Sequence, residues 1–396
     1  MRVAYVNADP GVPVFGTKGS SIHLQEVISA FLKRGANVDL FTSRIGSRAS
    51  SWKGICIHRL PEVSAPDPEM RERDLLAAND ALRSALEQCQ VDFLYERYSL
   101  WSFAAMEHAR AQGIPAILEV NAPLIEEQSS YRSLLNRAAA EGVAHRAFAA
   151  TTAIVAVSDE LTDYITKYSG ARDKIHIIPN GINPDRFTHT PPLWPGAADN
   201  FTVGFVGSLR PWHGLTTLIE AFAEFRRINP GARLLIVGDG PERATVAADL
   251  EKRALTGVSF LTGAVEPGAV PGWIASMDVA VAPYPKLANF YFSPLKVYEY
   301  MAAGKAVIAS RIGQLRKCIE HGVNGWHVEP GDPQSLAEAL ERLWRNPDLR
   351  DRLGHAAGVT VLRDHTWDSV VERIVKLADL APGELQRVER RPIIRV

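Results

Sequence analysis

Cysteine is scarce in this 396-residue chain, where Cys56, Cys89 and Cys318 are few, odd in number and far apart. This usage argues against a disulfide framework or a zinc cluster, and it fits a reducing cytosol. No apolar run approaches the length needed to cross a bilayer. A strand-like run over residues 2–7 begins at once, which leaves no room for a signal peptide. We therefore expect a cytoplasmic protein, possibly peripheral at the inner face of the membrane.

Charge of one sign is also lacking, since the formal net charge is -1. This balance argues against nucleic acid as the main partner. The dinucleotide fingerprint G-x-G-x-x-G is missing as well. Gly11, Gly16 and Gly19 have the wrong spacing for it, and the later cluster at 238–240 has Arg243 where the third glycine would stand. An NAD-linked oxidoreductase is therefore a weak alternative.

What is present is repeated alternation of strand-like and helix-like runs. We expect a strand at 93–95, a helix at 100–112, a long amphipathic segment at 131–150 and a strand at 153–157. Such β-α repeats predict a parallel sheet covered on both faces. The proline-rich stretch Thr190–Asn200 interrupts the pattern, and a second Rossmann-like half begins after it. The length also favours two domains.

The stretch that organises the chain is F-Y-F-S-P-L-K-V-Y-E-Y-M-A-A-G-K at 290–305, which predicts a loop turning into a helix. Ser293 suits the N-cap and Pro294 the first helical position. The free N–H groups of a first helical turn and the helix dipole favour phosphate. Lys296 and Glu299 share a face, where they suit the phosphates and ribose of a nucleotide diphosphate. A plain amphipathic helix is the alternative.

Two further motifs accompany this stretch: N-G-I-N-P-D-R-F at 180–187 and G-S-L-R-P-W-H-G at 207–214. Together the three segments resemble a GT-B glycosyltransferase of family 4. The resemblance implies an α/β fold of two Rossmann-like, doubly wound parallel-sheet domains facing a central cleft, with a C-terminal helix crossing back to the first domain. It implies an acceptor-side domain at 1–190 with the crossover helix at about 366–381. It implies a donor-binding domain at 200–365, and we interpret 382–396 as a loosely held tail.

The resemblance and the residue chemistry give a set of candidate site residues. The candidates for catalysis are Arg210, Lys296 and Asn121. The candidates for nucleotide and donor binding are Glu299, Tyr291, Phe292, Ser293, Pro294, Leu295, Gly19, Gly16, Val265 and Gly238. Glu299 would bind ribose, backbone near Val265 would contact the base, and the loop at 16–19 would face the phosphates and the acceptor.

The chain departs from the family pattern at four of its positions. Ser208 and His213 stand where the family commonly has Arg and Lys, and Arg210 is proposed to replace the missing arginine. Tyr291 stands in place of the first of two glutamates, and Asn121 in place of a histidine near the sugar. An amide can hydrogen-bond a sugar hydroxyl but cannot act as a base. No clear enzymic nucleophile is left.

An Asp-x-Asp pair, which metal-dependent GT-A transferases use to hold a divalent ion, is missing from the sequence. We therefore expect no metal and no cofactor. The expected activity is retaining transfer of a hexose-type sugar from a UDP- or GDP-linked donor to a glycan or lipid-linked acceptor. A nucleotide-sugar 2-epimerase and a non-catalytic sugar-binding protein remain alternatives. Arg132, Arg137 and Arg146 could face anionic lipid, although a solvated helix face is the more ordinary interpretation.

Overall fold

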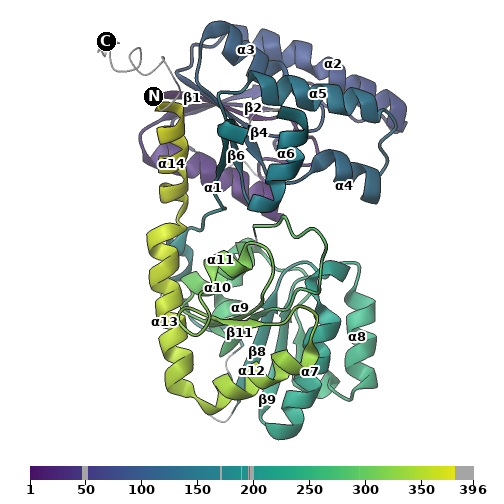
Figure 1. Ribbon diagram of the computed structural model, residues 1–396, viewed down its shortest axis with the longest axis vertical. Helices are drawn as coiled ribbons and strands as arrows, with labels where there is room; N and C mark the ends of the chain where they lie inside the picture. Colours follow the sequence, from purple (N-terminus) through teal and green to yellow (C-terminus); the bar gives the residue numbers. More distant parts are fainter. Residues whose placement is uncertain are drawn as a thin grey trace. The chain divides into compact units, whose positions relative to one another are not determined.

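The computed structural model describes residues 1–46, 52–169, 172–188, 190–194, 196, 200–293 and 295–379. The chain forms two compact units (Figure 1). Unit 1 comprises residues 1–180, the short segment Tyr291–Ser293 and the chain from Trp367 onward. Unit 2 comprises residues 181–290 and the chain up to Thr366 that follows Ser293. The expected tail at 382–396 lies outside the described residues.

Unit 1 alternates strands and helices along the chain. Its elements are β1 (Arg2–Asn7), α1 (Gly19–Lys33), β2 (Asn37–Thr42), β3 (Ile55–Arg59), α2 (Pro68–Glu87), β4 (Phe93–Arg97), α3 (Ala104–Gln112), β5 (Ala116–Val120), α4 (Leu124–Tyr131), α5 (Arg137–Ala150), β6 (Ala153–Ala156), α6 (Thr162–Ser169), β7 (Ile175–Ile177) and α14 (Trp367–Asp379). Short 3-10 turns occur at Asp159–Leu161 and Arg172–Lys174.

The strands of unit 1 form one parallel sheet in the order β3-β2-β1-β4-β5-β6-β7. Two groups of helices pack against it: α1 with α14, and the row α2, α3, α5 and α6 (Figure 1). Strands buried on both faces read as continuous apolar runs, which is why β1, β5 and β6 are so hydrophobic. The sheet order changes direction around β1 and β4, where open α/β sheets place ligands.

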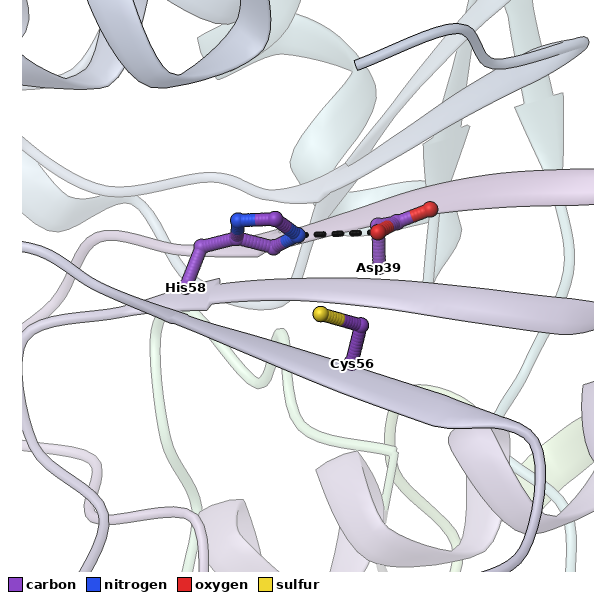
Figure 2. A group of neighbouring side chains, drawn as sticks. All are labelled: Asp39, Cys56 and His58. Carbon is purple, nitrogen blue, oxygen red and sulfur yellow. Dashed lines mark hydrogen bonds and ion pairs between the residues drawn. The ribbon is translucent and has the colours of Figure 1, made fainter. Parts of the chain in front are cut away.

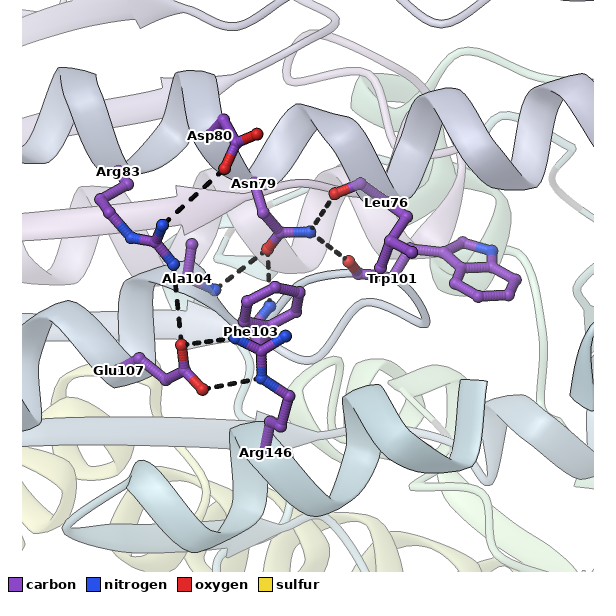
Figure 3. A network of polar contacts seen from close by, with 9 residues as sticks. All are labelled: Leu76, Asn79, Asp80, Arg83, Trp101, Phe103, Ala104, Glu107 and Arg146. Carbon is purple, nitrogen blue, oxygen red and sulfur yellow. Dashed lines mark hydrogen bonds and ion pairs between the residues drawn. The ribbon is translucent and has the colours of Figure 1, made fainter. Parts of the chain in front are cut away.

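The start of α3 shows how side chains set an element boundary (Figure 3). The helix expected at 100–112 begins only at Ala104, because Asn79 of α2 satisfies its first turn. The Asn79 Oδ1 accepts hydrogen bonds from the backbone N–H groups of Phe103 and Ala104 at 2.9 and 3.0 Å. Its Nδ2 donates to the carbonyls of Leu76 and Trp101, each at 2.8 Å. A side chain from a distant helix therefore supplies the cap.

Unit 2 repeats the same construction. Its elements are a 3-10 turn at Pro184–Phe187, β8 (Phe201–Val206), a 3-10 turn at Pro211–His213, α7 (Leu215–Ile228), β9 (Ala232–Val237), α8 (Arg243–Lys252), a 3-10 turn at Thr256–Val258, β10 (Ser259–Leu261), a 3-10 turn at Pro267–Ala269, α9 (Val270–Ala275), β11 (Val279–Ala282), α10 (Leu295–Ala302), β12 (Ala306–Ser310), α11 (Leu315–Cys318), β13 (Trp326–Val328), α12 (Pro333–Arg345) and α13 (Pro347–Asp364).

The strands of unit 2 form a second parallel sheet in the order β10-β9-β8-β11-β12-β13. Its core is continuous from β8 through α7 and α12, with Phe205, Phe222 and Phe225 fully buried. The two-sheet α/β architecture predicted from the β-α repeats is confirmed. The elements β3, α2, most of α4, α9, α11, α12, α13 and β13 were not anticipated.

Helix α14 packs on α1 within unit 1 (Figure 1). The Trp367 ring meets the His23 ring edge-on, with centroids 4.9 Å apart. An ion pair joins Arg34 to Glu372 at 3.2 Å, on the exposed side of the same contact. Helix α14 is therefore held by both an aromatic contact and surface charge, of which the buried aromatic contact contributes more.

The amphipathic segment expected at 131–150 proves to be the end of α4 and the whole of α5, and two of its three arginines are engaged. Arg146 makes a bidentate contact with Glu107, with both N···O distances 2.8 Å, and covers the Phe103 ring (Figure 3). Arg137 pairs with Glu141 at 2.9 Å and Glu126 at 3.5 Å. These pairs favour the solvated-face interpretation over a lipid-binding face. Among the helices of the described residues, none is long and apolar enough to cross a bilayer.

Candidate active site

Lys296 of α10 is a buried cation within unit 2. Its ammonium Nζ is shielded from solvent and has no hydrogen-bond partner in the part of the chain that the structure describes. The Nζ lies 4.2 Å from the centre of the Phe205 ring and 5.4 Å from that of Tyr284. Burial lowers the pKa of Lys296 to about 7, and Glu299 opposes this only in part. A buried amine held this way is poised to meet an anion.

The glycine that ends β8 keeps this place open. Gly207 has φ +145°, and a Cβ there would lie 2.8 Å from the Lys296 Nζ. Gly238, at the end of β9, has φ +132°, and a Cβ there would lie 2.1 Å from the Gly207 carbonyl oxygen. Only glycine fits at either position. The two strand ends therefore approach each other closely beside the lysine.

His213 stands next to this lysine as a neutral group. Burial, together with the charges of Lys296 and Arg210, lowers the pKa of His213 to about 3. Its Nδ1 donates to the carbonyl of Ser208, so its other ring nitrogen, Nε2, does not carry a proton. Where the family commonly has a lysine, this chain has an uncharged ring. Positive charge at this strand end thus comes from Lys296, with Arg210 farther out.

Arg210 itself is exposed. Its guanidinium lies 5.7 Å from the Trp212 ring and lines a hollow that also includes Thr216, Glu242 and Asp249. Its proposed role as a phosphate clamp stays a prediction, because the side chain must reach a ligand from this outer position.

Glu299 is joined to the second sequence motif. Its carboxylate lies 3.8 Å from Arg186 Nη1, and both side chains are about one fifth exposed, at 18% and 21%. The Arg186 Nη2 in turn donates to the carbonyl of Pro267 at 2.9 Å. The half-buried Val265 belongs to the loop that leads to Pro267. Three segments that are distant in sequence therefore meet around Glu299, which fits the predicted ribose and base contacts without testing them.

The segment that precedes α10 belongs to unit 1. The Tyr291 hydroxyl donates to the carboxylate of Glu127 on α4, and the Ser158 hydroxyl donates to the Tyr291 carbonyl at 2.9 Å. Phe292 is half-buried and packs on Tyr291, with ring centroids 4.4 Å apart. The tyrosine that replaces the family's glutamate is thus already engaged by a carboxylate.

The predicted cap at the start of α10 is not tested. The Ser293 Oγ accepts a hydrogen bond from the backbone N–H of Asn180 at 3.1 Å, and Pro294 lies outside the described residues. Helix α10 begins at the half-buried Leu295. The buried contact ties the N-G-I-N-P-D-R-F motif to the segment before the helix.

Asn121 follows β5 beside a buried ion pair. The His23 Nε2 and Glu119 Oε1 lie 3.0 Å apart, and both side chains are 3% exposed. Burial raises the pKa of Glu119, but His23, Arg97 and Asn121 outweigh it, so this pKa lies below its usual value. Asn121 thus lies beside a charged carboxylate, while its own Nδ2 is buried without a hydrogen-bond partner among the described residues.

The glycine-rich loop of unit 1 has a different character at its two predicted residues. Gly16 is closed in by Ser21 and Pro13, and its carbonyl accepts from Gln25 Nε2 at 3.0 Å. Gly19 begins α1 and has open space where a Cβ would stand. Open space at the first helical residue suits contact with a ligand, whereas Gly16 serves the turn.

Some residues that contact the predicted site residues could not be found from the sequence. Glu127 and the His23–Glu119 pair have no local signal, since a contact between residues 23 and 119 depends on the sheet order. Arg186 does have one, because it lies within the N-G-I-N-P-D-R-F motif.

Two family models match the chain, one over each half. The model for glycosyltransferase family 4 matches residues 17–186, and the model for glycosyl transferases group 1 matches residues 200–346. The chain belongs to these family 4, group 1 glycosyltransferases. The resemblance stated from the three motifs is confirmed, and with it the glycosyltransferase class.

Similar proteins include other glycosyltransferases. A D-inositol 3-phosphate glycosyltransferase of Pseudarthrobacter chlorophenolicus is 24% identical over 370 residues, covering 86% of this chain and 85% of that protein. A phosphatidyl-myo-inositol mannosyltransferase of Mycobacterium leprae is 32% identical over 215 residues, covering 54% and 55%.

Solved structures support the fold. A sucrose-phosphate synthase from Thermosynechococcus elongatus has a TM-score of 0.73 at 19% identity, covering 95% of this chain and 98% of that one. The Anabaena protein HepE, in complex with UDP and glucose, has a TM-score of 0.70 at 18% identity, with the same coverage. The GT-B fold is therefore shown for this glycosyltransferase.

Proposed function

We propose that this glycosyltransferase moves a hexose-type sugar, with retention and without a metal, from a nucleotide-diphosphate sugar to a glycan or lipid-linked acceptor. One observation carries the donor part of this proposal: the buried ammonium of Lys296 has no hydrogen-bond partner among the described residues. Leaving such a group unpaired costs free energy, which an oxygen of a diphosphate would return on binding.

The surroundings of Lys296 suit a diphosphate. Lys296 lies in the first turn of α10, where free N–H groups and the helix dipole favour negative charge. Gly207 leaves room for a ligand to approach the strand end. With no Asp-x-Asp pair in the sequence, we assign neutralisation of the departing diphosphate to Lys296, to the α10 start and to Arg210.

Glu299 and the loop that includes Val265 would hold the nucleoside. The carboxylate accepts hydrogen bonds from the ribose hydroxyls, while Arg186, 3.8 Å away, orients it. Solved proteins of similar fold were crystallised with UDP and with UDP-glucose, which makes UDP-sugars the first donors to test.

The glycosyl group would leave through an oxocarbenium-like transition state. Tyr291 and Asn121 offer a phenol and an amide where the family pattern has a carboxylate and a histidine, and neither supplies a ready nucleophile. Front-face transfer therefore follows, with the departing phosphate taking the acceptor's proton. Retention would then need no covalent glycosyl-enzyme.

The decisive experiment is a thermal-shift panel of UDP-, GDP- and ADP-sugars, followed by calorimetry on the best ligand. Lys296→Met and Glu299→Gln should each weaken donor binding by about tenfold or more, because each loses a charge-assisted contact. Glu251→Gln, on the exposed face of α8, is the control and should bind normally. Equal donor affinity in Lys296→Met and the parent chain would overturn the donor site.

The stereochemistry of transfer and its metal dependence are tested by separate measurements. Product NMR on the transferred sugar should show the anomeric configuration of the donor, and chelator should leave the rate unchanged. Inversion would contradict retention. Loss of activity with chelator at an unchanged melting temperature would contradict metal independence of the transfer step. Release of an epimerised sugar nucleotide without acceptor would identify a 2-epimerase instead.

A further inference from the structure

A cluster of metal-ligand side chains lies at the edge of the unit 1 sheet, away from the strand ends described above. Cys56 and His58 are two residues apart on the edge strand β3, so both side chains project from the same face of the sheet. Asp39 on β2 is paired in register with Cys56 and joins them on that face (Figure 2). Carboxylate, thiol and imidazole atoms of these three residues all lie within 4.8 Å of one another.

A fourth donor comes from the end of α2. The Cys89 Sγ lies 3.8 Å from the His58 Nε2, and Asp39 Oδ1 lies 2.8 Å from the same nitrogen. The Asp39 oxygen and the Cys89 sulfur thus approach the same ring nitrogen, which can form only one good hydrogen bond. His58 cannot satisfy both partners by hydrogen bonding, but a metal ion among the donors would satisfy all of them.

Two of the ligand-to-ligand distances are close to those of a tetrahedral zinc site. Ligands at Zn–N and Zn–O distances of about 2.0 Å and Zn–S of about 2.3 Å stand roughly 3.3 to 3.8 Å apart. The contact between Cys89 and His58 already has this length, and Asp39 needs to retreat from His58 by only about half an ångström. The His58 ring is held in place by stacking on Phe41, with centroids 4.5 Å apart.

Charge is balanced around such an ion. The Arg2 Nε lies 3.2 Å from the Asp39 Oδ2, so the carboxylate keeps one oxygen for Arg2 and turns the other inward. Two thiolates and this carboxylate would be neutralised by Zn²⁺ together with Arg2. Hydrogen-bonded outer partners of this kind orient metal ligands. Cys56 is exposed, which gives the ion a path from solvent.

We propose that Asp39, Cys56, His58 and Cys89 bind one Zn²⁺ ion that ties the edge strand β3 to β2 and to the end of α2. The site is structural, because four protein ligands leave the ion no open position. The sequence did not predict this site, because its four ligands are spread over residues 39–89, whereas the usual zinc motifs place ligand pairs close together. It also protects an otherwise unpaired sheet edge.

The test uses the full chain, purified with reductant and stripped with chelator. Titration with Co²⁺ should give one equivalent of thiolate-to-cobalt charge-transfer absorption in the near ultraviolet, which Zn²⁺ then displaces. Zn²⁺ should also raise the melting temperature. Cys56→Ser and His58→Gln should each weaken Zn²⁺ binding by about 100-fold or more, because even outer partners are worth 10–100-fold.

Cys318→Ser is the matched control, since Cys318 is the one cysteine of the sequence outside the cluster, and it should leave the cobalt spectrum unchanged. Because Cys56 is exposed, its serine variant keeps the fold and makes the comparison interpretable. Reduced protein without the thiolate band would overturn the proposal. Unchanged binding in Cys56→Ser, or equal loss in Cys318→Ser, would overturn it as well.

Discussion

The ammonium of Lys296 lies 4.2 Å from the centre of the Phe205 ring, so an aromatic face replaces the hydrogen bonds that a buried cation normally receives. Such a contact offsets only part of the cost of desolvation, because cation–π attraction is worth roughly 2 kcal/mol when water is excluded. The remaining cost is what lowers the pKa of Lys296 to about 7. An anion that binds here above about pH 7 must therefore change the protonation of this lysine.

We predict that UDP binding takes up a proton in mildly alkaline solution. The bound diphosphate raises the pKa of Lys296 from about 7 toward its ordinary value of 10.5, so the lysine is neutral when free and charged when bound. Uptake should be largest between these two values and vanish well below 7. Calorimetry in buffers of different ionisation enthalpy measures it, and Lys296→Met should abolish it. Uptake that persists in this variant would assign the proton to another group.

Because Tyr291 contacts Glu127, a glutamate at position 291, as in the family pattern, should destabilise this chain. Tyr291→Glu replaces a donor by a second carboxylate beside Glu127, so unit 1 should lose about 1 kcal/mol or more of stability. The double variant with Glu127→Gln should recover most of this loss, because an amide can donate to the new carboxylate. Urea unfolding of the single and double variants provides the comparison. Additive losses would show that the two residues are not coupled.

Glu96 gives unit 1 a pH dependence of known sign. It is fully buried at β4, and burial raises its pKa from 4.5 to about 7, against the hydrogen bond that Ser102 donates. Folded Glu96 therefore keeps its proton at pH values where the unfolded chain has lost it. Stability is lost as pH rises from about 4.5 to about 7, by at most on the order of 3 kcal/mol.

Glu96→Gln removes this dependence, since an amide does not titrate. The variant should gain stability on the parent chain as pH rises through the same window, and the difference should be constant below it. Denaturant unfolding of both proteins across this window tests the sign. Glu87→Gln, exposed at the end of α2, is the control. A variant that loses stability relative to the parent chain as pH rises through this window would contradict the assignment.

Replacing Asn79 should strongly reduce the stability of unit 1. Asn79→Ala removes four hydrogen bonds and leaves the first turn of α3 without its cap, so we expect a loss of roughly 2–4 kcal/mol. Hydrogen exchange at Phe103 and Ala104 should accelerate first. Asp80→Ala, on the same helix with its side chain 87% exposed, should change stability by less than about 0.5 kcal/mol. Equal effects of the two changes would remove Asn79 from this role.

The sequence by itself determined the α/β class and the family. Both depend on patterns within a short window: strand runs, and motifs such as that at 207–214. The same windows placed Lys296 and Glu299 on one helix face. Local physics is enough for such features, because helix period and turn chemistry act between near neighbours.

The tertiary structure alone decided which distant groups meet. Parallel strands are joined by long crossovers, so register and strand order bring together residues that lie tens of positions apart. That is how Glu119 finds His23, how Asn79 caps α3, and how Cys56 and His58 come to face Asp39. Burial is decided in the same way, and it leaves the Lys296 ammonium without a hydrogen-bond partner in the described part of the chain.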